Sequence, residues 1–389
     1  MVAIIPNEII NFGNLKNCMN KIIYFISASL FLILFSSCSE EVVSKSDGKQ
    51  TAIVYSVLNA SESIHYVKIN RAIFGGGNSI NIAQIPDSSY FKNVDAKVEE
   101  YVGGTLTRTW ILKDTMIENK EEGAFYYPLQ KVYYFQTTST EPLLADNQTT
   151  YKLDANINNG EFHVIGETKL VSGMSIGSPK PESFFTFAKS DVPKFGYAST
   201  NIGFGTGNAA KLEINLTIEF DEYIDNTLFA NKSFVWTVGE YEGASILGPS
   251  MSMTTSADGK TFYDLIALNV TKNNLINKRQ LKKITISEYG ASEDLQKYLL
   301  VNKPTSSLTQ NKALYTNLTV TNENRVLGIF SSRGSAQRVK VNWLHITGST
   351  YYTALDKNSV KELCLGTITG PYSFCDDHPN YTAEQYFCK

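Results

Sequence analysis

Between Leu212 and Phe220 the chain alternates strictly between apolar and polar residues. Successive side chains of a β-strand point to opposite faces, so this pattern predicts a strand with one buried and one solvated face. The composition agrees, because 22 Tyr and 21 Phe, together with many Thr, Val and Ile residues, favour strands. We therefore expect a mainly β protein.

Residues 51–171 have the pattern of a β-sandwich. A strand at Ala52–Leu58 is followed by a turn and a returning strand at Ile64–Ile73, and Gly103-Gly104 separates two further strand patterns, which is a strong hairpin signal. Tyr151, in the penultimate strand, resembles the tyrosine corner of immunoglobulin-like sandwiches. Because no cysteine accompanies this tyrosine, a fibronectin-like or regulatory sandwich is the closer analogy within the immunoglobulin-like class.

Ser172–Lys180 is rich in Gly, Ser and Pro and is the expected linker to a second domain. That domain, residues 181–389, is predicted to be larger and β-rich, with small helical insertions. One helix is expected at Ser292–Leu300 with Ser292 as N-cap, and a short one after Ser359, where Ser359 and Glu362 match a capping box. Further strand patterns occupy residues 233–238, 262–270, 283–288, 325–330 and 338–346.

The N-terminus has the pattern of a bacterial lipoprotein signal. The apolar segment Ile22–Phe35 follows the positive charge of Lys21, and it is shorter than the ~20 apolar residues of a membrane-spanning helix. It leads into Ser36-Ser37-Cys38, where small residues precede a cysteine. We expect translation to start at Met19, residues 1–37 to be removed as a signal peptide, and Cys38 to be lipidated. The alternative is cleavage by the ordinary signal peptidase, which would leave a free thiol.

Residues 38–50 form a polar tether behind the lipidated cysteine. Each buried CH₂ of an acyl chain contributes about 0.8 kcal/mol, so several chains on Cys38 would anchor the protein stably to a membrane. The acidic run Ser39, Glu40 and Glu41 resembles the surface-export signal of Bacteroidota lipoproteins. We therefore expect an outer-membrane protein exposed at the cell surface; a simple spacer is the alternative for these residues.

Several function classes are disfavoured by the sequence. The net charge of −3 provides no basic surface for nucleic acid. Gly173–Gly177 matches G-x-S-x-G, but a nucleophile elbow needs a core parallel strand before it and a helix after it, and a flexible linker suits this context better. Gly203–Gly207 and Gly75–Gly77 lack the strand–helix context of a dinucleotide fingerprint, so we expect turns or loops there and no cofactor.

Three cysteines lie near the C-terminus: Cys364, Cys375 and Cys388. In an oxidising compartment a disulfide between two of them is expected, and it would hold the tail on the second domain. The sequence does not select the pair. A zinc site that includes His378 and a set of free thiols are the alternatives, although the spacing lacks the close ligand pairs of structural zinc sites. We predict no metal site.

Aromatic residues cluster in two short segments, which contain Tyr126 and Tyr127 and then Tyr133 and Tyr134. Tyrosines on a rigid sheet can form a platform for a sugar or peptide ligand, because they offer an apolar face beside a polar group. The alternative is that alternate members fill the core of the sandwich while the others face water. The same two interpretations apply to Trp236 and Trp343, which lie within strand patterns.

Carboxylates offer the one visible route to catalysis. Glu219 and Asp221 would share one face of their strand, and Glu222 follows directly, so an acid/base pair is conceivable, although a solvated edge has the same pattern. Asp376-Asp377 has no calcium-loop spacing around it. The histidines His65, His163, His345 and His378 lack recognisable partner motifs.

Several of these features together resemble a group of Bacteroidota outer-membrane lipoproteins defined only by a domain of unknown function. The resemblance rests on the signal at Cys38, on Thr150–Leu153 at the end of the N-terminal module, and on Tyr315-Thr316-Asn317 and Gly328–Arg333. It implies an accessory role beside a TonB-dependent outer-membrane transporter and brings no catalytic residues. We expect a non-enzymatic ligand-binding or transporter-accessory protein; an extracytoplasmic hydrolase and a structural or adhesive envelope protein are the alternatives.

Overall fold

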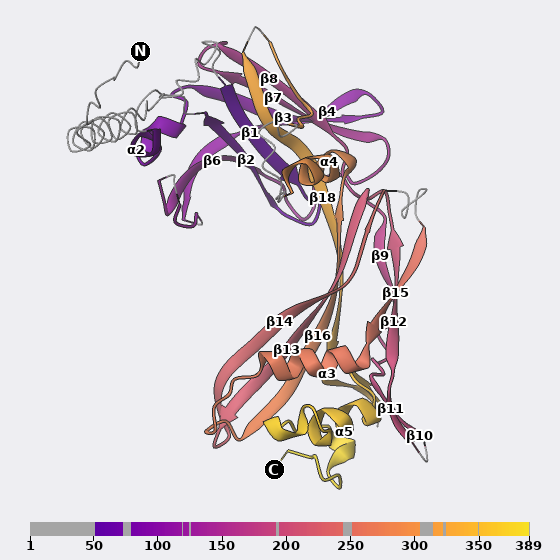
Figure 1. Cartoon of the computed structure of the whole chain (residues 1–389). Coiled ribbons are helices and arrows are strands. Elements are labelled where there is room, and N and C mark those ends of the chain that lie inside the picture. The colour runs from indigo at the N-terminus through magenta and orange to yellow at the C-terminus, as the bar shows by residue number, and fades with distance from the viewer. Residues whose placement is uncertain are drawn as a thin grey trace, which may run out of the picture. The chain divides into compact units, whose positions relative to one another are not determined.

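The computed structural model describes residues 51–72, 79–118, 120–123, 126–191, 194–243, 251–303, 314–321, 324–348 and 350–388. The predicted signal peptide, the tether with Cys38, Ser39, Glu40 and Glu41, and the glycines at 75–77 lie outside these residues. Most of the described chain is in β-strands, with a few short helices (Figure 1). The prediction of a mainly β fold with small helical insertions is confirmed.

Two sheets contain most of the strands. The eight-stranded sheet has the order β14-β13-β16-β18-β1-β2-β6-β5, and the five-stranded sheet has the order β17-β8-β7-β3-β4. The strands of the larger sheet are β1 (Thr51–Leu58), β2 (Ile64–Arg71), β5 (Lys113–Glu118), β6 (Leu129–Gln136), β13 (Lys211–Ile224), β14 (Thr227–Glu242), β16 (Lys278–Ala291) and β18 (Arg325–Val341). Those of the second sheet are β3 (Val94–Val102), β4 (Thr105–Ile111), β7 (Thr149–Ile157), β8 (Phe162–Thr168) and β17 (Leu318–Val320).

The remaining elements that the structure describes form small sheets, helices and 3₁₀ turns. Small sheets are formed by β9 (Met174–Ser178), β12 (Ser199–Thr206) and β15 (Ser252–Asp258), by β10 (Ala188–Asp191) and β11 (Lys194–Tyr197), and by β19 (Trp343–Thr347) and β20 (Thr350–Thr353). The α-helices are α2 (Ser79–Ala83), α3 (Gly259–Asn269), α4 (Glu293–Asn302) and α5 (Lys357–Leu365). Single 3₁₀ turns lie at η1 (Pro86–Ser89), η3 (Gly370–Tyr372) and η4 (Pro379–Tyr381).

A β-sandwich forms over most of residues 51–171, as expected, although its strands are not confined to that range. Its core contains fully buried side chains from both sheets, among them Val54, Tyr151 and Phe162. The Tyr151 hydroxyl accepts a hydrogen bond from the Leu144 backbone N–H at 2.6 Å and donates one to Glu100 Oε2 at 2.8 Å. A tyrosine bonded to the backbone a few residues upstream is the arrangement of a tyrosine corner.

Two strands from the range assigned to the second domain complete this sandwich. β17 pairs with β8, and the first half of β18 pairs in parallel with β1, with Thr51 opposite Arg325. The second half of β18 pairs with β16. Gly328 makes the parallel pairing possible, because its φ is +104° and a Cβ there would collide with the Val54 carbonyl oxygen. β18 therefore pairs with a strand of the N-terminal sandwich at one end and with a strand of the C-terminal region at the other.

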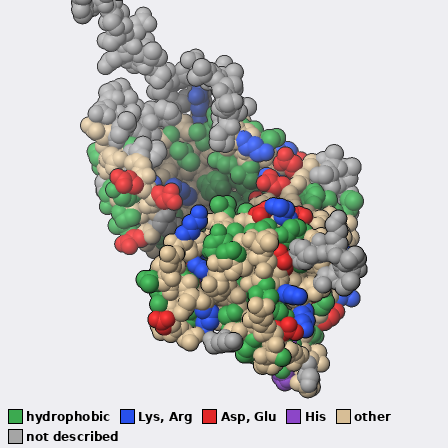
Figure 2. All heavy atoms as spheres, turned by 60° about the horizontal axis from the view of Figure 1, so that its bottom comes forward, with side chains coloured by type: hydrophobic (Ala, Val, Ile, Leu, Met, Phe, Trp, Pro, Cys, Tyr) green, Lys and Arg blue, Asp and Glu red, His purple; other side chains and the backbone are tan. Residues whose placement is uncertain are grey.

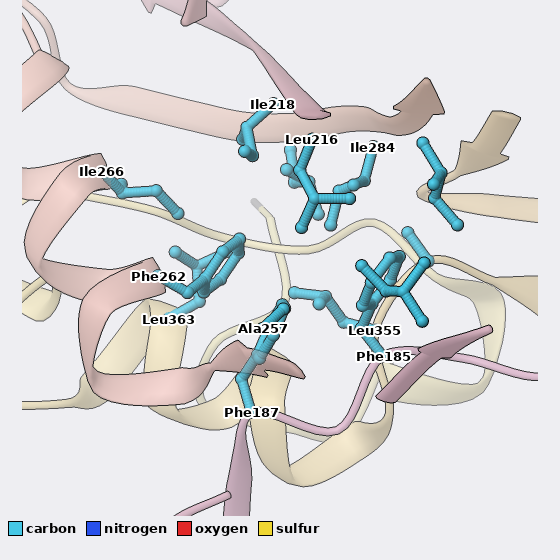
Figure 3. Close-up of a cluster of buried hydrophobic side chains, with 14 of the residues drawn as sticks. Phe185, Phe187, Leu216, Ile218, Ala257, Phe262, Ile266, Ile284, Leu355 and Leu363 are labelled. Carbon is cyan, nitrogen blue, oxygen red and sulfur yellow. The ribbon is translucent and has the colours of Figure 1, made fainter. Parts of the chain in front are cut away.

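A second core lies where β13 and β16 meet α3 and α5. Apolar residues alternate along β13, and those on one face are fully buried, as the alternation predicts. Figure 3 shows the side chains that fill this core, drawn from the sheet, from both helices and from the segments between them: Leu216, Ile218, Ile284, Phe262, Ile266, Leu363, Phe185 and Phe187. This core supports the C-terminal tail, by which we mean residues 366–388, after α5 (Lys357–Leu365).

The strand predicted at residues 262–270 is wrong, because this segment belongs to α3. Asp258 caps the helix by accepting a hydrogen bond from the Thr261 backbone N–H at 2.8 Å. Phe262 and Ile266 lie one turn apart, so a helix buries both against the second core, and their high strand propensity is overridden by tertiary packing.

The linker predicted at Ser172–Lys180 is also wrong, because β9 occupies much of it and pairs with β12. Gly290 and Gly334 face each other across β16 and β18, and Met174 of β9 fills the space that their missing side chains leave. A Cβ on Gly290 would lie 2.6 Å from the Met174 sulfur. The composition of the segment indicated a loop, but this contact between strands decides its structure.

Three smaller corrections follow. The loop predicted at Gly203–Gly207 is mostly strand β12, in which Gly203 and Gly205 pack closely against serines of β9. The strands predicted at 325–330 and 338–346 are joined through the intervening residues as β18, with β19 beginning at Trp343. The second helix is capped by Asp356 rather than Ser359, whose buried hydroxyl instead accepts a hydrogen bond from the Phe187 backbone N–H at 2.7 Å. Helix α4, with Ser292 as its N-cap, forms as predicted.

Candidate functional site

The predicted aromatic residues separate into two environments. Tyr133 is 5% exposed and belongs to the core of the sandwich, whereas its neighbour Tyr134 points to the opposite face of β6 and is half-buried. Tyr126 and Tyr127 lie in the connection between β5 and β6, outside both strands, and Tyr127 is exposed. Alternation along β6 thus places Tyr133 in the core and Tyr134 outside it, as the packing interpretation predicted for this pair, whereas neither Tyr126 nor Tyr127 is in the core.

Three tyrosines lie on the outer face of neighbouring strands β1, β2 and β6. Tyr55 and Tyr66 are 36% and 44% exposed, and Tyr66 lies opposite Tyr134 with ring centroids 6.5 Å apart. Tyr55 also contacts Tyr298 of α4, with centroids 5.8 Å apart. We call Tyr55, Tyr66 and Tyr134 the tyrosine face. The sheet fixes their backbones, so these rings are positioned before any ligand arrives.

Polar groups border the tyrosine face. The Lys68 ammonium donates a hydrogen bond to Gln130 Oε1 at 2.9 Å, and Arg333 forms an ion pair with Glu62 at 2.6 Å. Burial raises the pKa of Tyr55, and Tyr298 adds to this effect while Arg333 opposes it. The hydroxyl therefore stays protonated and can donate as well as accept.

A cleft of about 280 Å³ lies where the tail meets the larger sheet. It is lined by Asp221 and Tyr223 of β13, by residues 280–282 of β16, by residues 341–343 at the junction of β18 and β19, and by Asp377 of the tail. We call it the Trp343 cleft, because the half-buried indole of Trp343 forms part of its wall. Both the ligand-platform and the core interpretation applied to Trp343 in the sequence, but no local pattern connects this residue with Tyr223 or Asp377.

A larger cleft, of about 400 Å³, lies beside the N-terminus of α4. Its lining includes Lys169, Asn208 and Asp294, and these groups already hold the fold together. Asn208 bonds the backbone of residues 170 and 172, Lys169 donates to the Asn147 carbonyl, and Asp294 accepts hydrogen bonds from Tyr315 and Asn317. These three side chains therefore have structural roles in the fold.

The carboxylates considered for catalysis are engaged in structural contacts. Glu219 and Asp221 share one face of β13, as predicted, but Glu219 pairs with Lys283 at 3.0 Å and Asp221 accepts from Asn231 at 2.6 Å. Glu222 points to the other face, where it is fully buried in an ion pair with Arg279 at 2.9 Å. The three side chains therefore do not converge on one substrate position.

The cysteine prediction is confirmed for one disulfide, which joins Cys375 and Cys388. Cys364 is a buried free thiol, and burial raises its pKa. The disulfide closes a loop within the tail, and backbone hydrogen bonds attach this loop to the sheet, including one from the Cys375 N–H to the Arg279 carbonyl at 2.9 Å. Across the part of the chain that the structure describes, no group of three His, Cys, Asp or Glu side chains is placed to hold a metal ion.

Charges on the described surface are mixed. Figure 2 shows one face on which hydrophobic side chains gather in a hollow while acidic and basic side chains are interspersed elsewhere. Of the helices that the structure describes, none has the length and apolarity needed to cross a bilayer.

Comparisons with known proteins give little further information. No family model matches the chain, and no curated protein matches it. Among solved structures, the C-terminal globular domain of an oligosaccharyltransferase from Pyrococcus abyssi matches over 60% of this chain and 42% of that chain, with 10% sequence identity and a TM-score of 0.23. At this TM-score the similarity carries no argument about function.

Proposed function

We propose that this chain is a lipid-anchored, non-enzymatic binding protein at the surface of the outer membrane, where it assists a TonB-dependent transporter in nutrient uptake. The lipoprotein pattern that ends at Cys38 and the acidic residues after it support the location. The tyrosine face carries the binding part of the proposal, because it presents aromatic rings to solvent on a rigid sheet.

The tyrosine face suits a ligand that combines apolar surface with hydrogen-bonding groups. Tyr66 and Tyr134 offer ring faces, while Lys68 and Gln130 lie on the same two strands and supply donors and acceptors. Tyrosine has few rotatable bonds, so little conformational entropy is lost when a ligand packs against it. A glycan or a peptide has the required chemistry. Catalysis by Glu219 and Asp221 is not proposed, because both side chains are already paired.

The proposal is tested with the full-length protein in detergent-solubilised outer membranes. We expect a TonB-dependent transporter to co-purify with it, and a glycan or peptide from a binding panel to be retained. Tyr66→Ala together with Tyr134→Ala should weaken ligand retention by about tenfold or more, since aromatic contacts dominate such surfaces. Tyr289→Ala is the matched control, because Tyr289 is equally exposed but lies on β16.

Two results would argue against the proposal. The first is recovery of the protein without any transporter and without binding to any member of the panel. The second is unchanged ligand retention in the double tyrosine variant. The anchor is tested separately, because Cys38→Ala should abolish the incorporation of a labelled fatty acid into the protein without affecting the ligand.

A further inference from the structure

The Trp343 cleft is a built site rather than a gap between loops. Four segments far apart in the sequence converge on it, and one of them is the C-terminal tail, which supplies Asp377. The indole N–H of Trp343 donates a hydrogen bond to Asp377 Oδ1 at 2.8 Å. Tyr351 and His378 also contact the indole, with ring centroids 5.8 Å and 6.0 Å away. These contacts fix the orientation of the Trp343 ring.

The disulfide loop holds Asp377 in position. Asp376 and Phe387 pair as a short parallel bridge, and the Cys388 N–H donates to the Asp376 carbonyl at 2.9 Å. The side chain of Gln280, which lines the cleft, donates to the Cys388 sulfur at 3.2 Å. The geometry of the cleft therefore depends on the disulfide between Cys375 and Cys388.

Tyr223 provides an uncommitted polar group. Its hydroxyl makes no hydrogen bond to another residue within the described ranges of the chain. Asp221 and Asp377 line the same cleft as Tyr223, and their negative charges add to the effect of burial in raising the pKa of Tyr223. A ligand in the cleft thus meets an aromatic wall with hydroxyl and carboxylate groups around it.

Charge in and around the cleft is nearly balanced. Lys282, which lines the cleft, lies 3.6 Å from Asp221, and the Lys278 ammonium lies 4.5 Å from the centroid of the Tyr223 ring. An anionic ligand would be repelled by two carboxylates, and a cationic ligand would compete with two lysines already present. A neutral ligand meets neither difficulty.

We propose that the Trp343 cleft binds a neutral saccharide. One face of a pyranose ring carries C–H groups and packs on an indole, while its hydroxyl groups pair with planar carboxylate and amide side chains such as Asp377, Asn342 and Gln280. The volume, about 280 Å³, is near the lower end of the range for small-molecule sites, so one sugar unit of a longer chain occupies it. The cleft shares no residue with the tyrosine face and is a second, separate site.

The test is calorimetric titration of the soluble chain from residue 39 onward with a panel of neutral oligosaccharides: cello-, malto-, manno-, laminari-, xylo- and chitohexaose. At least one of these should bind with a Kd between about 10 μM and 1 mM. Trp343→Ala should weaken that binding by about tenfold or more, and Tyr223→Phe, which removes only the hydroxyl, by about threefold to tenfold. Trp236→Phe, a change of another strand tryptophan, should have no effect.

Opening the disulfide provides an independent arm. Cys375→Ser with Cys388→Ser should abolish saccharide binding while circular dichroism shows the sheets intact. The proposal is overturned if no oligosaccharide binds at concentrations up to about 10 mM. It is also overturned if a folded Trp343→Ala variant binds the oligosaccharide with unchanged affinity. A third refuting outcome is that choline or citrate binds in the cleft while the sugars do not. If Tyr66→Ala loses saccharide binding and Trp343→Ala keeps it, the Trp343 cleft is not the saccharide site, and the result supports the tyrosine face as the binding surface.

Discussion

Glu288 of β16 should make the stability of this protein fall as the pH rises. Its side chain is 0% exposed, and neither carboxyl oxygen has a hydrogen-bond partner of normal geometry among the described residues. Burial raises the pKa of Glu288 to about 8, and the backbone N–H of Ser175 opposes only part of that effect. At neutral pH the group is therefore mostly protonated and uncharged.

The magnitude follows from the difference between the folded and unfolded pKa values. The unfolded chain titrates near 4.5 and the folded chain near 8, so the folded state holds the proton more tightly. The stabilisation by this proton is complete below the unfolded pKa and is lost as the pH rises through the folded pKa. At ~1.4 kcal/mol for each pH unit, this group lowers the free energy of unfolding by ~3 kcal/mol between acidic pH and pH 7, and by ~5 kcal/mol above the folded pKa.

Urea unfolding of the wild-type chain and Glu288→Gln at pH values between about 5 and 8.5 tests this expectation. Glutamine has nearly the same shape but cannot ionise, so the variant should lose less stability than the wild type as the pH rises. The difference between the two curves of unfolding free energy against pH reports the titration of Glu288 alone. Glu240→Gln, on the exposed side of β14, is the control and should run parallel to the wild type. Parallel curves for Glu288→Gln as well would refute the reasoning.

Two further predictions concern buried charge. Arg279→Ala should destabilise the fold by ~3–5 kcal/mol in urea unfolding, because Glu222 would keep a buried charge without its partner. The double variant Glu222→Leu with Arg279→Met replaces the whole ion pair by apolar side chains and should recover much of that loss. A double variant as unstable as Arg279→Ala would contradict this expectation. Burial lowers the pKa of His65 from 6.5 to about 4. The neutral imidazole therefore stabilises the fold at pH values above 6.5, and this stabilisation is lost as the pH falls through 4. The free energy of unfolding should fall by ~3 kcal/mol over that range. His65→Gln should flatten that acid limb, and an unchanged limb would show that another group causes it.

Local patterns predicted much of the fold. The alternation from Leu212 to Phe220 identified β13, and Gly103-Gly104 marked a hairpin in which both glycines have positive φ. Ser292 was correctly identified as a helix cap, and Tyr151 as a tyrosine corner. Each of these features depends on residues near one another in the chain, so the information lies within a short window of sequence.

Features decided by distant contacts could not be predicted. Residues 172–180 have the composition of a linker, but β9 docks there through its pairing with β12 and through the space left by Gly290 and Gly334. The Trp343 cleft combines Tyr223, Trp343 and Asp377 from separate segments, and no local motif connects them. For the aromatic cluster, alternation predicted that Tyr133 and Tyr134 would face opposite ways, but it did not identify Tyr55 and Tyr66 as neighbours of Tyr134.

The division of β18 between two partners affects how this chain can mature. Thr51, at the start of β1, pairs with Arg325, so a chain that crosses a membrane N-terminus first exposes the edge of β1 until nearly all of the protein has followed. Pairing over such a sequence distance is slow, and exposed edges aggregate. If the chain is exported as proposed, the protein should therefore depend on factors that hold it unfolded during export. A fragment ending at residue 171 should aggregate, whereas the whole chain folds.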